Sequence, residues 1–119
     1  MRTTIRETRD RYELELDRKG AEDGTFLLVE KLCLQLREDL TEGSFKTVNI
    51  IFPSSLSNVR QRRILDCVSA SLQISKSCET LTLEGCGLST STLATVFDGM
   101  SAKIEIVQQV RKNELRLKR

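Results

Sequence analysis

The stretch Cys78–Phe97, CETLTLEGCGLSTSTLATVF, is the best-marked structural unit in the chain. Leu81 and Leu83 are two residues apart and alternate with polar residues, which predicts a strand with one buried face. Gly85 and Gly87 follow this strand at once, and glycines at this position favour a turn. The stretch therefore begins with a short strand that ends in a glycine turn.

A helix is predicted after the turn. The run Ser89–Thr92 offers several side-chain oxygens that can cap a helix N-terminus. The apolar residues that follow recur at three- and four-residue spacing, which predicts a helix with one apolar stripe: Leu93, Val96, Phe97 and Met100.

The strand and turn resemble one unit of a leucine-rich repeat protein. Cys78, Leu81, Leu83, Cys86 and Leu88 are spaced as in the pattern L-x-x-L-x-L-x-x-N/C-x-L, in its cysteine-containing, ribonuclease-inhibitor-like form, with Cys at the first position. The resemblance covers residues 78–97. It implies that the leucines fill a core, that a helix covers the convex side, and that the polar positions Thr80, Thr82 and Glu84 form an exposed binding surface.

Composition predicts one globular domain over residues 1–119. The apolar fraction is 39%, the charged fraction is 30% and the formal net charge is +2, which are ordinary values for a globular chain. We see no apolar run long enough to span a membrane, and Met1–Lys19 is charged throughout, unlike a signal peptide. We therefore expect an intracellular, cytoplasmic protein without a membrane partner.

The chain offers little for catalysis or metal binding. The cysteines Cys33, Cys67, Cys78 and Cys86 lie at irregular spacings where the pattern calls for a small apolar group, which favours reduced core thiols. Without a histidine or a Cys-x-x-Cys pair, a zinc site is disfavoured and the thiols have no imidazole base. Residues 85–90 lack the third glycine of the dinucleotide-binding pattern and the Gly-Lys-Ser/Thr of the nucleotide-binding loop, so they predict a structural turn. We expect no enzyme and no cofactor.

The remaining elements follow from hydrophobic periodicity. Residues 1–10 are polar and predicted to be frayed, although Ile5 is compatible with a strand start, and residues 20–24 are predicted to form a turn. A helix is predicted over Phe26–Leu40, covered on more than one side and closed by Gly43. The other predicted elements are a half-buried strand from Tyr12 with an acidic outer face, a strand over Val48–Phe52 buried on both faces, a helix over Asn58–Ser75, and strands over Lys103–Gln109 and Asn113–Lys118.

This order predicts an α/β fold in which a mostly parallel sheet carries packed helices and ends in a C-terminal hairpin. The apolar pairs Leu14/Leu16, Val48/Ile50, Leu81/Leu83 and Ile104/Ile106 form a quasi-repeat. Two architectures fit this spacing: a short, irregular domain of the leucine-rich repeat kind and an ordinary open α/β sandwich.

A second resemblance concerns the junction between the Val48–Phe52 strand and the next helix. The order of elements and the pair Ser54-Ser55 are similar to the STAS domain of anti-sigma-factor antagonists, in which a serine at this junction is phosphorylated. Pro53 and Leu56 stand where that family has Asp and Gly. The resemblance implies a phosphoregulated domain, while helix capping by the serines is the other interpretation.

Basic residues are unevenly distributed and suggest a partner surface. They gather in the helix over Asn58–Ser75, whose inward face is predicted to be Val59, Ile64, Leu65, Val68, Leu72 and Ile74, and in the C-terminal tail. The candidate contact residues are Arg60, Arg62, Arg63, Arg111, Lys112, Arg116, Lys118 and Arg119. Such a surface suits an acidic protein partner or nucleic acid, and the near-neutral total charge with 4% aromatic residues disfavours nucleic acid.

The sequence thus predicts a non-enzymatic protein-protein interaction module, as one subunit of a larger assembly. Thr80, Thr82 and Glu84 are the expected binding positions on the sheet. An RNA-associated basic protein and a phosphoregulated antagonist-type domain are the alternative functions.

Overall fold

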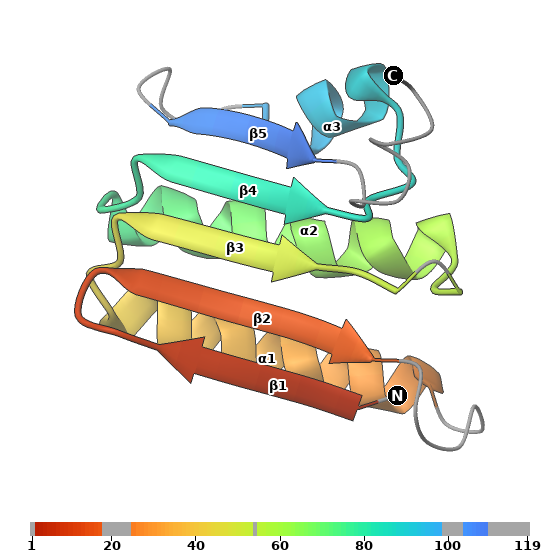
Figure 1. Cartoon of the computed structure of the whole chain (residues 1–119), viewed down its shortest axis with the longest axis horizontal. Coiled ribbons are helices and arrows are strands. Elements are labelled where there is room, and N and C mark those ends of the chain that lie inside the picture. Colours follow the sequence, from red (N-terminus) through yellow and green to blue (C-terminus); the bar gives the residue numbers. More distant parts are fainter. Residues whose placement is uncertain (1, 18–24, 54, 99–103, 110–119) are drawn as a thin grey trace.

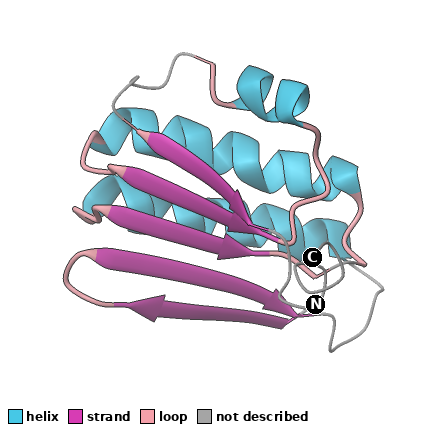
Figure 2. Ribbon diagram, turned by 45° about the horizontal axis from the view of Figure 1, so that its top comes forward, coloured by secondary structure: helices cyan, strands magenta, loops and turns pink. Residues whose placement is uncertain are grey.

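The computed structural model describes residues 2–17, 25–53, 55–98 and 104–109. Within these ranges the chain forms a five-stranded sheet with three helices packed on one of its faces (Figures 1 and 2). The elements are β1 (Arg2–Glu7), β2 (Arg11–Asp17), α1 (Thr25–Glu42), β3 (Thr47–Ile51), α2 (Asn58–Ser75), β4 (Thr80–Glu84), α3 (Thr90–Val96) and β5 (Glu105–Gln109). The predicted α/β class is confirmed.

The strands lie in the sheet in the order in which they occur in the chain. β1 pairs with β2 antiparallel, and β2, β3, β4 and β5 pair parallel to their neighbours (Figure 1). The predicted mostly parallel sheet is therefore confirmed. Because each crossover advances to the next strand in the same direction, right-handed connections place all the crossover helices on the same face.

The core fills the space between the sheet and the helices. Strand side chains alternate, so every second residue points toward the helices. The largest fully buried side chains belong to these strand positions, to the helix faces opposite them and to the segment after β3: Tyr12, Leu14, Val29, Leu36, Leu40, Ile50, Phe52, Ile64, Leu65, Leu72, Leu81 and Leu83. The predicted inward faces of β2 and β4 are confirmed.

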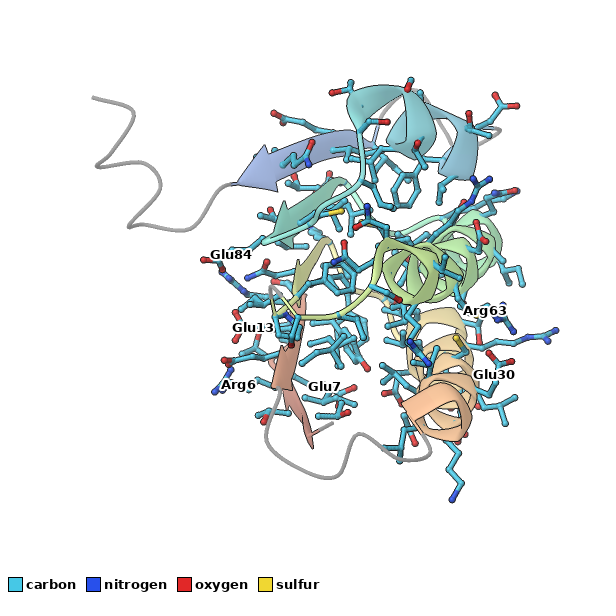
Figure 3. All side chains as sticks on the ribbon, turned by 90° about the vertical axis from the view of Figure 1, so that its right-hand side faces the viewer. Arg6, Glu7, Glu13, Glu30, Arg63 and Glu84 are labelled. Atoms are coloured by element: carbon cyan, nitrogen blue, oxygen red, sulfur yellow. The ribbon has the colours of Figure 1, made fainter. Side chains whose placement is uncertain are left out.

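The two long helices expose their outer sides, which corrects one prediction. On α1, Leu34 is 69% exposed, but the helix packs against both the sheet and α2, which agrees with the predicted cover on more than one side. On α2, Val59 and Ile74 are 81% and 60% exposed, although both were assigned to the inward face. Apolar content overestimated the buried face, because the sheet and one neighbouring helix leave the outer side of each helix in solvent (Figure 3).

The N-terminal end of the sheet differs from the prediction, whereas the described C-terminal strand agrees with it. The prediction that residues 1–10 are frayed is wrong, because Arg2–Glu7 forms β1. The polar side chains of β1 fit this position, since an edge strand with one uncovered face needs few apolar residues. β5 confirms the strand within Lys103–Gln109, and it pairs parallel to β4. The second strand of the predicted hairpin and the turn over residues 20–24 lie outside the described residues.

The turn after β4 is built as its glycines indicate. Gly85 has φ 72°, a left-handed conformation that favours glycine. A Cβ at Gly87 would lie 2.7 Å from Oδ1 of Asn58, so a larger residue at this position would displace the end of the Asn58 side chain. Ser89 then caps α3, its Oγ accepting a hydrogen bond from the backbone N–H of Thr92 at 3.2 Å. The predicted strand, turn and capped helix are confirmed for the part of the stretch before Met100, which lies outside the described residues.

Candidate functional site

One face of the sheet is not covered by any of the three described helices, and we call it the open face. It consists of the strand positions that alternate with the core positions (Figure 3). The register places on it Thr4, Arg6, Arg11, Glu13, Glu15, Thr47, Asn49, Ile51, Thr80, Thr82, Glu84, Glu105 and Val107. The open face is therefore a mainly polar surface on a rigid scaffold.

A single row of side chains crosses the centre of the open face. Strand pairing aligns Arg6 with Glu13, Glu13 with Asn49, Asn49 with Thr82, and Thr82 with Val107. Directly opposed residues on neighbouring strands are close enough for their side chains to interact. We call these five residues the central row.

An ion-pair network fixes one end of the central row. Nη1 of Arg6 donates to Oε2 of Glu13 at 2.8 Å and to Oε1 of Glu15 at 3.2 Å. A second guanidinium, that of Arg11, lies 3.5 Å from Oε1 of Glu13. The Arg6 contact orients Oε2 of Glu13 toward β1, while Oε1 faces both Arg11 and the side chain of Asn49 on β3.

The same contacts shift the pKa values of the two central groups. Burial tends to raise the pKa of Glu13, but the hydrogen bonds from Arg6 and Asn49 outweigh it, and the net shift is downward. The hydrogen bonds from Glu13 and Glu15 raise the pKa of Arg6. Glu13 and Arg6 are therefore both charged across the neutral pH range.

Asn49 lies at the middle of the central row and carries an unpaired polar atom. Its side chain is only 8% exposed, and its Nδ2 donates to Oε1 of Glu13 at 3.0 Å. This orientation leaves Oδ1 buried without a hydrogen-bond partner among the described residues. A buried carbonyl oxygen without a donor costs free energy, about 1–3 kcal/mol, so a ligand that shifts the covering side chains and donates a hydrogen bond to this oxygen would be favoured.

No motif in the sequence marks Asn49 as a site residue. The signal was present: a single amide lies between apolar residues in a run predicted to be buried on both faces. The structure confirms that Val48, Asn49 and Ile50 are all buried, although none of the described helices covers Asn49. The Glu13 side chain of β2 contacts it instead.

The predicted strand positions lie beside Asn49. Thr80, Thr82 and Glu84 are half-buried on the open face of β4, and Thr82 belongs to the central row. Glu84 projects from the same side of the sheet as Arg6 and Glu13 (Figure 3). The structure thus brings the three predicted strand residues together with the ion-pair network of β1 and β2.

The predicted basic residues of α2 lie on the other side of the sheet. Arg63 projects near Glu30 of α1, away from Arg6 and Glu84 (Figure 3), and holds this carboxylate through Nε and Nη2, both at 2.9 Å. Arg62 is exposed, and Arg60 is half-buried. The tail residues Arg111, Lys112, Arg116, Lys118 and Arg119 lie outside the described residues. The strand set and the helix set of predicted contact residues therefore do not form one surface.

The glycine turn before α3 is occupied by internal hydrogen bonds. The backbone N–H of Gly87 donates to Oε1 of Gln61 at 2.8 Å, and Nε2 of the buried Gln61 donates to the carbonyl of Leu56 at 2.9 Å. Near this turn, a hollow of about 360 Å³ lies between the starts of α2 and α3. Because Ser89 already accepts from the N–H of Thr92, the arrangement supports the structural turn predicted from the sequence.

The described residues offer neither a membrane-spanning helix nor a metal-binding cluster. None of the helices in that part of the chain combines the length and apolar character that a membrane span requires. No group of three or more His, Cys, Asp or Glu side chains within the described ranges is placed to hold a metal ion.

Comparison with known proteins gives no relative: no protein-family model, no curated protein and no solved structure matches this chain. Both family resemblances seen in the sequence therefore remain hypotheses that rest on the residues that carry them.

Proposed function

We propose that this protein is a non-enzymatic interaction module that binds a protein partner through the open face. The observation that carries the proposal is the central row, in which a buried Asn49 Oδ1 lacks a donor beside a fixed Arg6–Glu13 ion pair. A sheet face with aligned polar side chains is already ordered, so this protein loses little conformational entropy when a partner binds to it.

The charges of the open face indicate the kind of partner. Its described positions carry four carboxylates, Glu13, Glu15, Glu84 and Glu105, and two guanidiniums, Arg6 and Arg11. A segment with Lys, Arg or amide donors would complement the carboxylates and supply the hydrogen bond that Asn49 lacks. This differs from the acidic partner expected from the sequence, which was inferred from the basic residues of α2 and the tail.

The same charges disfavour RNA as the ligand of the open face. Nucleic-acid binding relies on Lys and Arg contacts to phosphates and weakens steeply with salt. An excess of carboxylates would repel the phosphates. The RNA-associated alternative therefore depends on Arg60 and Arg62, which lie on α2 on the other side of the sheet, and on the basic tail, which lies outside the described residues.

The test is affinity purification of the native protein from its own cells, with and without nuclease and at two salt concentrations. We expect a defined protein set that survives both treatments. The variant Thr82→Lys places a long cation in the central row, beside Asn49, and should remove that set by blocking the surface. Leu34→Lys, at an exposed position of α1 on the other side of the sheet, is the matched control and should leave the set unchanged.

The outcomes separate the hypotheses. Loss of all bound material on nuclease treatment would support the RNA-associated alternative. Equal binding by Thr82→Lys and the wild-type protein would contradict the open-face proposal, provided that the circular dichroism spectrum and melting temperature show both to be folded. Loss of binding by both lysine variants would place the contact elsewhere.

One observation favours the phosphoregulated alternative as a second candidate function. The cap of α2 is Ser57, whose Oγ accepts from the backbone N–H of Arg60, and Ser55 is exposed in the turn before it. Ser55 is thus not the capping residue, whereas Ser54 lies outside the described residues. Ser55→Asp should abolish partner binding without unfolding the domain if the serine is regulatory, and unchanged binding by both Ser54→Asp and Ser55→Asp would reject this candidate.

A further inference from the structure

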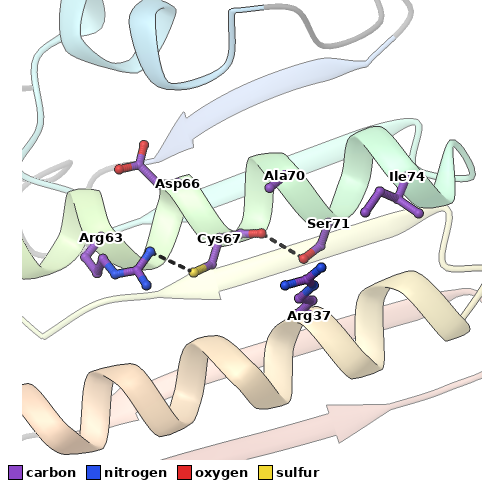
Figure 4. A pocket seen from close by; sticks show the side chains of 7 residues that line it. All are labelled: Arg37, Arg63, Asp66, Cys67, Ala70, Ser71 and Ile74. Atoms are coloured by element: carbon purple, nitrogen blue, oxygen red, sulfur yellow. Dashed lines mark hydrogen bonds between the residues drawn. The ribbon is translucent and has the colours of Figure 1, made fainter.

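A pair of cysteines lies between the two long helices, on the side of the sheet opposite the open face. Cys67 on α2 is half-buried and lines a hollow of about 330 Å³ together with Arg37, Arg63, Ser71 and others (Figure 4). Cys33 on α1 is buried at 4% exposure. Cys67 is therefore the thiol that a small molecule in the hollow would meet.

The two thiols lie at the same level of the helix pair. The Sγ of Cys33 lies 3.9 Å from the backbone carbonyl of Arg63. In an α-helix this carbonyl faces the N–H of the residue four positions later, which here is Cys67. Besides burial, the Cys67 thiol raises the pKa of Cys33, as expected for neighbouring sulfurs. Cys33 and Cys67 are therefore close neighbours at the contact between α1 and α2.

Arg63 gives Cys67 a cationic partner that is held in place. Its Nη1 donates to the Sγ of Cys67 at 3.3 Å, drawn as a dashed line in Figure 4. Its Nε and Nη2 are held by the Glu30 carboxylate at 2.9 Å each. Since the thiolate is the nucleophile, a neighbouring guanidinium donor favours reaction at this sulfur.

We propose that Cys67 is a thiol-modification site for small disulfides, and that Cys33 resolves the resulting mixed disulfide into a Cys33–Cys67 bond between α1 and α2. This proposal is independent of the function proposed for the open face.

The chemistry balances with one small disulfide, RSSR, as the oxidant. The Cys67 thiolate attacks one sulfur of RSSR, the S–S bond breaks, and one RS⁻ leaves with the electron pair. Cys33 then loses its proton to solvent and attacks the Sγ of Cys67, which expels the second RS⁻. Both protein thiols are oxidised to one disulfide, and RSSR is reduced to two RSH once the leaving thiolates take up the protons from Cys67 and Cys33.

The order of the two steps follows from the surroundings of each thiol. Burial, together with the neighbouring Cys67 thiol, raises the pKa of Cys33 to about 12, so Cys33 is a poor first nucleophile. The influence of the Cys67 thiol is lost when Cys67 enters the mixed disulfide. Burial also raises the pKa of Cys78 and Cys86, which makes them the internal controls for selectivity.

The test uses the full reduced chain and oxidised glutathione, followed by intact-mass measurement and peptide mapping without reduction. We expect glutathione to appear first at Cys67 and then to leave as a Cys33–Cys67 disulfide forms. Cys33→Ser should accumulate the mixed disulfide at Cys67, whereas Cys67→Ser should lose both products. Cys86→Ser is the matched control and should react like the wild-type protein.

Arg63 is tested as a positioning residue. Arg63→Gln should slow modification of Cys67 by roughly tenfold, because it removes a charge-assisted hydrogen bond to the reacting sulfur. Arg62→Gln, at the exposed neighbouring position, should leave the rate unchanged. Modification of Cys78 or Cys86 as fast as Cys67, or a mixed disulfide at Cys67 that persists in the folded wild-type protein, would overturn the proposal.

Discussion

Asn49 lies between Val48 and Ile50, which are fully buried against the helices, while its own side chain belongs to the open face. The alternation of a strand makes this arrangement unavoidable. The Glu13 carboxylate accepts a hydrogen bond from the amide NH₂ of Asn49. The amide oxygen is left buried and has no hydrogen-bond partner among the described residues. The polar atom that defines the candidate interface thus lies next to the hydrophobic core.

Replacing Asn49 should separate stability from binding. Asn49→Val removes the unpaired oxygen and places a β-branched residue in a central strand, so the free energy of unfolding should rise by about 1 kcal/mol despite the lost hydrogen bond to Glu13. Partner binding should fall. Urea unfolding and affinity measurements would test both effects. A less stable Asn49→Val protein would mean that the lost hydrogen bond to Glu13 outweighs the cost of the unpaired oxygen.

Glu13 should make stability depend on pH in the acid range. Its pKa is lowered in the folded protein, so its contribution is present above the unfolded value of about 4.5 and is lost as pH falls through the lower folded value. The difference in unfolding free energy between the wild-type protein and Glu13→Gln should therefore shrink as the solution is acidified below about pH 4.5. Urea midpoints measured from neutral to acid pH would test this, and a constant difference would contradict it.

At the scale of elements, β4 shows how one strand serves the core and the candidate interface together. Leu81 and Leu83 are fully buried, whereas Thr80, Thr82 and Glu84 are half-buried on the open face. The sequence predicted this division correctly because strand alternation is local. Leu83→Ala should cost about 2–5 kcal/mol of stability through the cavity that it leaves.

Thr82→Ala is the matched control on the same strand and should change stability by less than about 0.5 kcal/mol. Chemical denaturation of both variants would measure the two effects. Equal losses of stability would show that the two faces of β4 are assigned wrongly.

The start of α2 depends on a capping hydrogen bond that a single substitution can test. Ser57 accepts a hydrogen bond from the N–H of Arg60 at 3.4 Å, a long contact for a helix cap. Ser57→Ala should therefore cost about 0.5–1 kcal/mol, near the lower end of measured cap substitutions. Ser55→Ala should be nearly silent in the same thermal denaturation experiment. The opposite ranking would identify Ser55 as the cap.

At the scale of the whole molecule, the two proposed sites lie on opposite sides of the sheet. Arg6 and Glu13 of the central row face away from the helices (Figure 3). Cys67 lies on α2 (Figure 4), and the Cys33 thiol of α1 lies near the Arg63 carbonyl of α2. Sites that share no contacts usually act independently. Oxidation with glutathione disulfide should therefore leave the affinity for an open-face partner unchanged, which calorimetry on reduced and oxidised protein would measure. A large change in affinity would show coupling through the sheet.

The sequence by itself determined the local structure of this protein. Period-two and helical spacing identified β2, β3, β4, β5, α1 and α2, and glycine and serine positions identified the turn and cap that begin α3, because these features depend on neighbours in the chain. The polar segment of β1 was missed, because an edge strand with an uncovered face carries little hydrophobic signal.

Only the tertiary structure decided which surfaces exist. Strand register placed Arg6, Glu13 and Asn49 in one row, helix packing brought Cys33 to Cys67, and the one-sided helix layer left Leu34, Val59 and Ile74 in solvent. The contacts of Glu13 with Asn49 and of Cys33 with α2 join residues far apart in the chain, and no local sequence pattern predicts such contacts. Burial and pairing arise from the sum of contacts across the whole sheet, so they appear only when the chain is folded.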